Sequence, residues 1–156
     1  MRLEEDIVNL YLKRAAVKQC DILYAWTNEE EVRRNSFNQE KIPYEQHVKW
    51  FNNKINSNSS IIFLCYEGEI PVGVVRIEME AAQGTISYSV DKNYRGKGVA
   101  SSMLKLLEEE IKNNKVDIHT LIGYVKFDNI PSQNIFKKLG YIEKIEEEAY
   151  KYEKDI

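Results

Sequence analysis

The chain has 156 residues, of which 43% are hydrophobic and 30% are charged, and its formal net charge is −3. This length and composition predict a single globular domain covering residues 1–156. The slightly acidic balance, with basic residues scattered along the chain, argues against general binding to nucleic acid or to an anionic membrane surface. The longest apolar runs are far too short to span a bilayer, and the N-terminus has no continuous apolar segment typical of a signal peptide.

Two cysteines, Cys20 and Cys65, lie far apart in the sequence. Two thiols do not make a disulfide framework, and no zinc-ligand spacing is present. We therefore expect reduced cysteines, no bound metal and a cytoplasmic location. The sequence leaves the oligomeric state open, with a homodimer as one alternative.

The first third of the chain predicts a strand within residues 8–17 followed by two helices. Asp21 is a candidate N-cap for the first helix. Pro43 precedes the second, in which apolar residues recur every three or four positions, namely Val48, Phe51 and Ile55.

The middle of the chain predicts three strands, "SIIFLCY", "VGVVRIEME" and "TISYSV", joined by the short turns "EGE" and "AAQG". Such short connections favour antiparallel hairpins. In the second strand Val75, Ile77 and Met79 share one face, while Arg76 and Glu78 share the other.

The pattern then changes to a helical period, and an apolar stripe predicts a helix of about four turns, formed by Val99, Ala100, Met103, Leu104, Leu107 and Ile111. A strand "IHTLIGYV", a short helix "PSQNIFKKL" ending at Gly140, and two closing strands "YIEKIEE" and "AYKYEK" follow. Hairpins followed by a strand–helix–strand pattern predict an α/β fold with a mixed sheet flanked by helices.

The stretch "VDKNYRGKGVASSML" places two glycines between a strand and a helix. The start of a helix leaves backbone N–H groups without partners, and glycine allows an anion to approach them closely. Arg95 and Lys97 add positive charge, so the stretch predicts a phosphate or pyrophosphate site. The P-loop motif is absent. Gly96, Gly98 and Ser101 nearly match the dinucleotide fingerprint, but the strand before them alternates polar and apolar residues, unlike a buried parallel strand. A helix-capping turn with surface charges is the remaining alternative.

The hexapeptide Arg95-Gly96-Lys97-Gly98-Val99-Ala100 resembles the coenzyme A turn of the GNAT acetyltransferases, R/Q-x-x-G-x-G/A. The segment "DNIPSQNIFKKLGY" resembles that family's second signature, N-x-x-[AS]-x-x-x-[YF]-x-K-x-G-[FY], with matches at Asn129, Ser132, Phe136, Lys138, Gly140 and Tyr141. The two segments stand in the family's order and at its spacing. The chain therefore resembles the GNAT N-acetyltransferases.

The resemblance implies a mostly antiparallel sheet in which two parallel strands, 87–90 and 121–125, splay apart around acetyl-CoA, the expected co-substrate. By the same resemblance, the residues expected to bind acetyl-CoA are Ser89, Val90, Arg95, Gly96, Lys97, Gly98, Val99, Ala100, Ser101, Asn129, Ser132, Phe136 and Lys138.

The resemblance also implies direct attack of an amine on the thioester. Many family members protonate the leaving thiolate with a tyrosine at the position of Phe136, and phenylalanine cannot do this. Either another group acts, for which Tyr124 and Tyr141 are candidates, or the thiolate leaves unassisted, which a thiol pKa of about 8.5 allows. Glu78 is the candidate general base, with a solvated surface glutamate as the alternative.

The segment "YAWTNEEEVRRNSFNQEKIPYEQHVKWF" resembles the acetyltransferases that accompany bacterial nonulosonic (pseudaminic or legionaminic) acid synthesis. This resemblance implies an acceptor that is an amino sugar linked to a nucleotide, contacted by Trp26, Asn28, Arg33, Ser36 and His47. The alternatives are that the aromatic residues belong to the core, that the histidine is structural and that the arginine is solvated. Two other functions stay open: acetylation of a protein or peptide, and a non-catalytic acyl-CoA-binding module.

Overall fold

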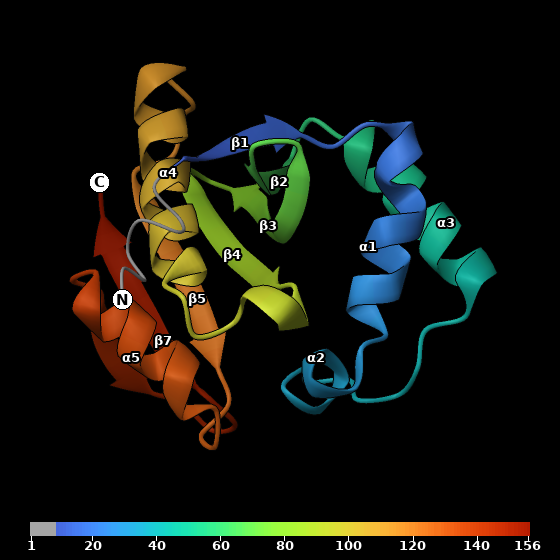
Figure 1. The fold of residues 1–156 in the computed structure, drawn as a ribbon. Coiled ribbons are helices and arrows are strands. Elements are labelled where there is room, and N and C mark those ends of the chain that lie inside the picture. The colour runs from blue at the N-terminus through green and yellow to red at the C-terminus, as the bar shows by residue number, and fades with distance from the viewer. Residues whose placement is uncertain (1–8) are drawn as a thin grey trace.

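The computed structural model describes residues 9–156, which form one seven-stranded sheet with helices on both faces (Figure 1). Its elements are β1 (Leu10–Arg14), the 3₁₀ turn η2 (Val17–Gln19), α1 (Cys20–Thr27), α2 (Glu30–Arg34), α3 (Tyr44–Ile55), β2 (Ser60–Glu67), β3 (Ile70–Glu80), β4 (Gln83–Val90), the 3₁₀ turn η3 (Lys92–Tyr94), α4 (Val99–Asn113), β5 (Thr120–Val125), α5 (Ile130–Lys138), β6 (Ile142–Ile145) and β7 (Tyr150–Asp155).

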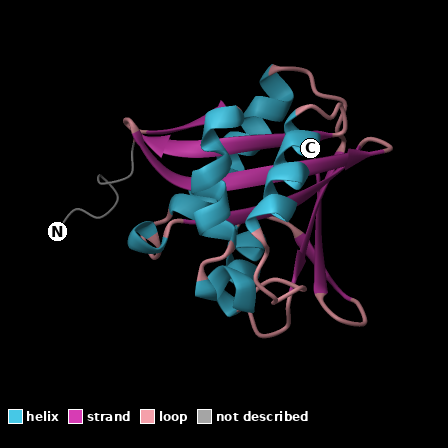
Figure 2. Cartoon of the chain, turned by 90° about the vertical axis from the view of Figure 1, so that its right-hand side faces the viewer, coloured by secondary structure: helices cyan, strands magenta, loops and turns pink. Residues whose placement is uncertain are grey.

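The strands lie in the order β1-β2-β3-β4-β5-β7-β6. Helices α4 and α5 cover one face, and α1 to α3 cover the other face over the first strands. Figure 2, seen from the α1–α3 side, shows these helices lying across the strands. The predicted mixed α/β architecture is confirmed, since β4 and β5 are parallel and the other neighbouring strands are antiparallel.

The parallel pair is short. Residues 83–86 of β4 pair with 120–123 of β5, and pairing stops there although both strands continue. Residues 87–90 therefore hydrogen-bond to β3 only, and Tyr124 and Val125 pair with β7 only. The predicted splay is present, although on β5 it begins later than expected, because Leu121 to Gly123 still pair with β4.

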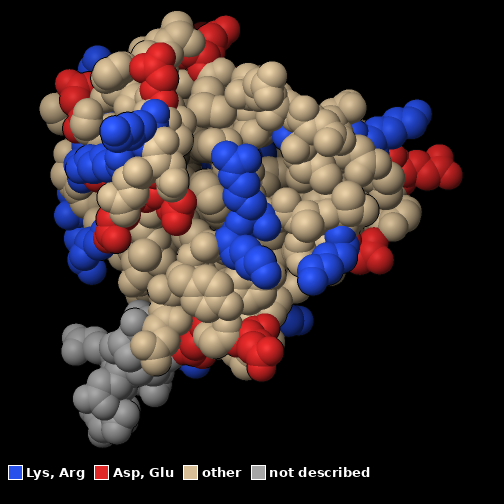
Figure 3. All heavy atoms as spheres, turned by 90° about the horizontal axis from the view of Figure 1, so that it is seen from above, with Lys and Arg blue, Asp and Glu red and all other residues tan. Residues whose placement is uncertain are grey.

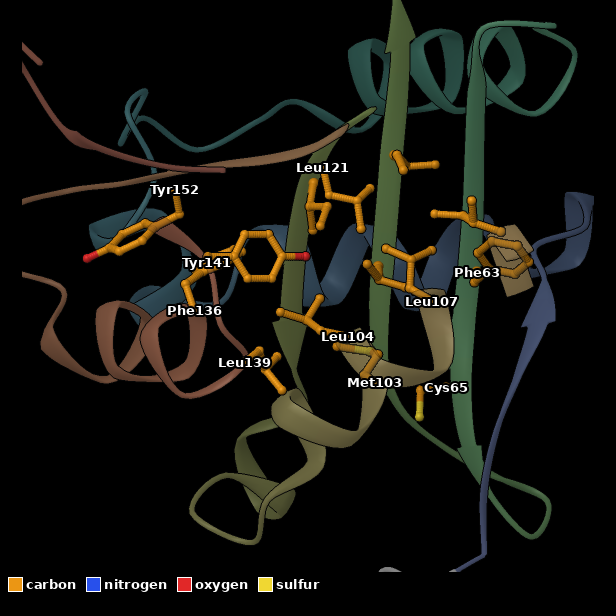
Figure 4. Close-up of a cluster of buried hydrophobic side chains, with 14 of the residues drawn as sticks. Phe63, Cys65, Met103, Leu104, Leu107, Leu121, Phe136, Leu139, Tyr141 and Tyr152 are labelled. Carbon is orange, nitrogen blue, oxygen red and sulfur yellow. The ribbon is translucent and has the colours of Figure 1, made fainter. Parts of the chain in front are cut away.

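The main core lies between the sheet and α4 (Figure 4). Met103, Leu104 and Leu107 of α4 are fully buried against the inward face of the sheet, which includes Val75 and Ile77 of β3. The alternation predicted for β3 is confirmed, because Arg76 and Glu78 point to the opposite face. A smaller apolar cluster joins that face to α1 and α3 through Leu23, Phe51, Ile62 and Leu64.

Of the two residues predicted at helix starts in the first third of the chain, one is confirmed and one is wrong. Pro43 is the N-cap of α3, as its position before that helix predicted. The prediction for Asp21 is wrong, because α1 begins at Cys20 with Gln19 as its N-cap. The carboxylate of Asp21 lies in the first turn and accepts a hydrogen bond from the Tyr44 hydroxyl at 2.7 Å. It links α1 to α3 instead of capping a helix.

Charge on the surface is mixed. Figure 3 shows both basic and acidic side chains on the face seen from above, with a short column of basic side chains near its centre. No helix within residues 9–156 has both the length and the apolar character that a membrane-spanning segment needs.

The β3–β4 turn is strained at two alanines. Ala81 and Ala82 have φ of 50° and 64°, and together they form the two-residue connection between Glu80 and Gln83. Two-residue hairpin turns with positive φ at both positions favour Asn-Gly, because a Cβ is disfavoured there.

We expect the double substitution Ala81→Asn, Ala82→Gly to raise the free energy of unfolding by about 1 kcal/mol, because it relieves this strain. Ala25→Gly in the exposed part of α1 is the matched control and should lower it by about 1 kcal/mol. Urea unfolding followed by circular dichroism measures both. A loss of stability in the turn variant would contradict the assignment of strain.

Candidate functional site

A cavity of about 930 Å³ lies where β4 separates from β5. Its walls come from α1 to α3, from the outward face of β3 and β4, and from the first turns of α4 and α5. The site thus joins the two halves of the chain. The α4 and α5 side carries the glycine-rich turn, and the α1–α3 side is aromatic.

The start of α4 supplies free hydrogen-bond donors to this cavity. Gly98 is the N-cap with φ of 83°, and no side chain caps the helix. The backbone N–H groups of Val99, Ala100 and Ser101 donate to no acceptor within the described residues; the first such bond runs from Ser102 N to Gly98 O at 3.2 Å. Because Gly98 and these three residues line the cavity, their N–H groups and the helix dipole can hold an anion such as a pyrophosphate.

Arg95 plays a different part from the one predicted. Its guanidinium forms an ion pair with Glu29, lies 3.3 Å from a carboxylate oxygen of Glu31, and donates through Nε to the carbonyl of Val90 at 3.1 Å. Burial alone would raise the pKa of Glu29, but the hydrogen bond and charge of Arg95 outweigh burial and hold that pKa below its usual value. Arg95 therefore ties the turn to α2, and its charge is already neutralised.

The other predicted cofactor residues divide into two groups. Ser89, Val90, Asn129, Ser132 and Phe136 line the cavity, together with Gly96 and the first residues of α4. Asn129 also caps α5, accepting from Ser132 N at 3.3 Å. Lys97 and Lys138 are exposed and do not line the cavity; the Lys97 ammonium lies over the Tyr94 ring.

The three predicted catalytic residues are not brought together. Glu78 does not line the cavity, and its carboxylate lies 2.9 Å from Lys54 Nζ and accepts from Ser60 Oγ at 3.3 Å. Tyr141 is buried in the core against Phe136, outside the cavity, and burial raises its pKa. Neither position suits the role predicted for it. Tyr124 lines the cavity with 42% of its surface exposed, and it stays the candidate acid.

The predicted acceptor residues mostly build the wall of the cavity. Arg33 donates four hydrogen bonds to its own loop, to the carbonyls of Thr27, Asn38 and Glu40 and to Ser36 Oγ. A guanidinium held in this way has little left to offer a diphosphate, so the predicted contact is not supported.

The same holds for the neighbouring residues of that segment. Asn28 does not line the cavity; it accepts from and donates to the backbone of Ile42 at 2.8 and 2.9 Å. His47 is buried with Nε2 3.0 Å from the carbonyl of Cys20. Trp26 donates to Asp91 at 3.0 Å, and its ring lines the cavity with Ser36 and His47.

The cavity also contains residues that the sequence did not predict as site residues, among them Tyr88, Arg76 and Trp50. Tyr88 lies in the splayed part of β4, and its hydroxyl is 2.7 Å from Ser132 Oγ; burial raises its pKa. Arg76 and Trp50 lie together, with the guanidinium 5.0 Å from the centre of the Trp50 ring. Arg76 could have been predicted as a site residue from the sequence. An arginine on the outward face of a buried strand needs a polar or anionic partner, which a ligand can provide.

Comparison with known proteins places this geometry in a family. The acetyltransferase (GNAT) domain family matches residues 9–142, and no curated protein sequence matches the chain. Of many similar solved structures, the ribosomal L7/L12 α-N-protein acetyltransferase RimL in complex with coenzyme A has 17% identity and a TM-score of 0.82, covering 96% of this chain and 95% of its own.

Two further structures have different acceptors. Spermidine N-acetyltransferase from Vibrio cholerae, with CoA and spermine, has 13% identity, a TM-score of 0.81, and covers 94% of this chain and 95% of its own. The aminoglycoside acetyltransferase AAC(6')-Ib with coenzyme A has 11% identity and a TM-score of 0.81, covering 94% of each chain. At these identities the likeness establishes the fold.

We expect Gly98→Val to raise the dissociation constant for CoA roughly tenfold or more, because a side chain and a disturbed backbone displace the N–H groups. Gly68→Val is the matched control, since Gly68 also has positive φ (61°) but lies in the distant β2–β3 turn. Both should lose about 1–3 kcal/mol of stability from strain. Calorimetric titration with CoA separates them, and equal affinities would place the pyrophosphate elsewhere.

The two tyrosines should respond differently to loss of the hydroxyl. Tyr124→Phe should lower kcat by roughly 10²-fold if its hydroxyl protonates the leaving sulfur. Tyr141→Phe should leave kcat unchanged and raise stability by up to about 1 kcal/mol, because its buried hydroxyl has no hydrogen-bond partner within the described residues. Steady-state rates and urea unfolding measure these two effects. A loss of kcat in Tyr141→Phe but not in Tyr124→Phe would make Tyr141 the general acid.

Proposed function

Because the chain belongs to the GNAT acetyltransferase family and uses acetyl-CoA as co-substrate, we propose that it acetylates the amine of a nucleotide-linked amino sugar. The single observation that carries the acetyl-CoA part is the row of free N–H groups at the start of α4 beside the splay of β4 and β5. The acceptor is the proposed part.

Acetyl-CoA supplies the activated acetyl group. In the proposed arrangement, the amides of Val99, Ala100 and Ser101 hold its pyrophosphate, and the unpaired edge of β4 at 87–90 orients the pantetheine as an added strand would. The side-chain amide of Asn129 lines the same passage. The acceptor enters from the α1–α3 side as a neutral amine, and its nitrogen bonds to the acetyl carbon as the C–S bond breaks. Tyr124 donates its hydroxyl proton to the leaving sulfur. The nitrogen releases its extra proton to water, and the tyrosinate takes a proton back from water.

Three features support a sugar acceptor. The segment 24–51 resembles enzymes that act on such sugars, and it forms one wall of the cavity. Trp26, Trp50 and Phe37 offer aromatic surface to a ring. The remaining lining is rich in hydroxyl and amide groups, which suit sugar hydroxyls.

Acetyl-CoA and two free thiols, Cys20 and Cys65, also support a cytoplasmic setting. A homodimer stays a prediction.

Two other functions compete. Acetylation of a protein N-terminus is favoured by the likeness of the fold to RimL. A non-catalytic acyl-CoA-binding module is favoured by Phe136, which is buried and stands at the position where the family resemblance implies a tyrosine.

Release of free thiol from acetyl-CoA in the presence of different amines separates the three. We expect release with a UDP-linked 4-amino-4,6-dideoxy sugar and none above background with a peptide bearing a free N-terminus. The Gly98→Val variant should lose the activity. Release with the peptide alone would exclude the sugar, and CoA binding without release for any amine would favour the binding module.

A further inference from the structure

We infer that Arg76 binds an anionic group of the acceptor, a carboxylate or a phosphate, and thereby selects amines that carry one. The inference rests on the proposed acetyl transfer in this cavity and adds to it the chemical class of the acceptor. It also assigns the anion to a different arginine from the one that the sequence indicated.

The charges that line the cavity lead to this assignment. Four charged residues line it: Glu31, Arg33, Arg76 and Arg95. The guanidinium of Arg33 is held by its own loop, and that of Arg95 by Glu29 and Glu31. Glu31 also lies 3.4 Å from Arg34. No lining carboxylate within the described residues is therefore free to hold a second positive charge.

The guanidinium of Arg76 is positioned on three sides and open on the fourth. Its Cζ atom lies over the Trp50 ring, 5.0 Å from the ring centre, and Nη2 donates to Ser87 Oγ at 3.3 Å. Nε lies 3.0 Å from an oxygen of Glu78, but its N–H does not point at that oxygen and makes no hydrogen bond. Nη1 has no hydrogen-bond acceptor within residues 9–156, so the terminal edge of the fork is available to a ligand.

The local charge is also unbalanced. Glu78 is shared between Arg76 and Lys54, so two positive charges face one carboxylate. Burial lowers the pKa of Arg76 more than Glu78 restores it. A partly buried guanidinium without full compensation is unfavourable. An anionic ligand would pair with Arg76 and remove part of this unfavourable electrostatic energy, which would favour its binding.

The position of Arg76 fits a group close to the reacting amine. In the β3–β4 register Arg76 lies opposite Ser87, the first residue of β4 beyond the paired segment. The guanidinium is therefore beside the mouth of the splay, where the thioester is expected. A compact molecule that carries both an amine and an anion can reach both places. A polyamine would instead meet a positive charge and no free carboxylate.

The test is calorimetric binding of four probes, with and without CoA, as two pairs that differ in one anionic group. Glucosamine 6-phosphate is compared with glucosamine, and tyrosine with tyramine. We expect the anionic member of at least one pair to bind roughly tenfold or more tightly, a preference that a buried charged hydrogen bond typically gives. The pair that responds distinguishes a phosphate from a carboxylate.

Variants assign the preference to the residue. Arg76→Met should abolish it, and Arg76→Lys should keep part of it, because a lysine retains the charge and loses the fork. Arg14→Met on the exposed edge strand β1 is the control for the same chemical change and should keep the preference. Thermal unfolding checks that each variant is folded. If Arg76→Met does not fold, the reduced preference of Arg76→Lys is the test.

Three results would overturn the inference: equal binding within both pairs, a preference that survives Arg76→Met, or no binding of any probe. Thiol release from acetyl-CoA, measured in parallel, keeps this test separate from that of the proposed function. Selective binding without thiol release under any condition counts against the function alone. Release with neutral amines as readily as with anionic ones counts against Arg76 alone.

Discussion

The structure depends on one arrangement with two parts. β4 stops pairing with β5 at Ile86 and Gly123. After the turn that follows β4, α4 starts at Val99 with N–H groups that no described residue uses. A sheet that leaves one strand edge open in its middle gives up hydrogen bonds. The open edge and the free N–H groups face the same cavity, so a ligand with an extended amide arm and a diphosphate would satisfy both. The backbone groups at both places therefore gain hydrogen-bond partners from the protein's ligand and not from the protein itself.

The packing of α5 explains how the two strands are kept in place around the opening. The Phe136 ring stacks on Tyr152 and packs so closely on Gly123 that a Cβ there would lie 2.4 Å from Cζ. β5 is thus fixed at its last paired residue. On the other side, Tyr88 of β4 meets Ser132 of α5 through their hydroxyl groups. Phe136 therefore has a structural reason to be aromatic and apolar, even though it lacks the hydroxyl that the family resemblance led us to expect at this position.

Much of the fold could be predicted from the sequence because it is set by local patterns. The alternation in β3, the helical stripe of α4 and the glycines at 96 and 98 each specify a neighbourhood within a few residues. The side-chain partners could not, because they are distant in the chain: Arg95 meets Glu29, and Glu78 meets Lys54. Charged residues that look available in sequence, such as Arg33, are satisfied by loops whose course only the folded chain defines. Tyr141 was wrong as the candidate acid because its position in the sequence motif does not reveal that its side chain faces the core.

The most direct test of the account follows the backbone amide signals of the α4 N-terminus by ¹H–¹⁵N NMR during a titration with CoA. The account predicts that the amides of Val99, Ala100 and Ser101 shift strongly and become protected from exchange, as donors to a bound pyrophosphate would. Tight binding that leaves these three signals unchanged, while amides elsewhere move, would contradict it.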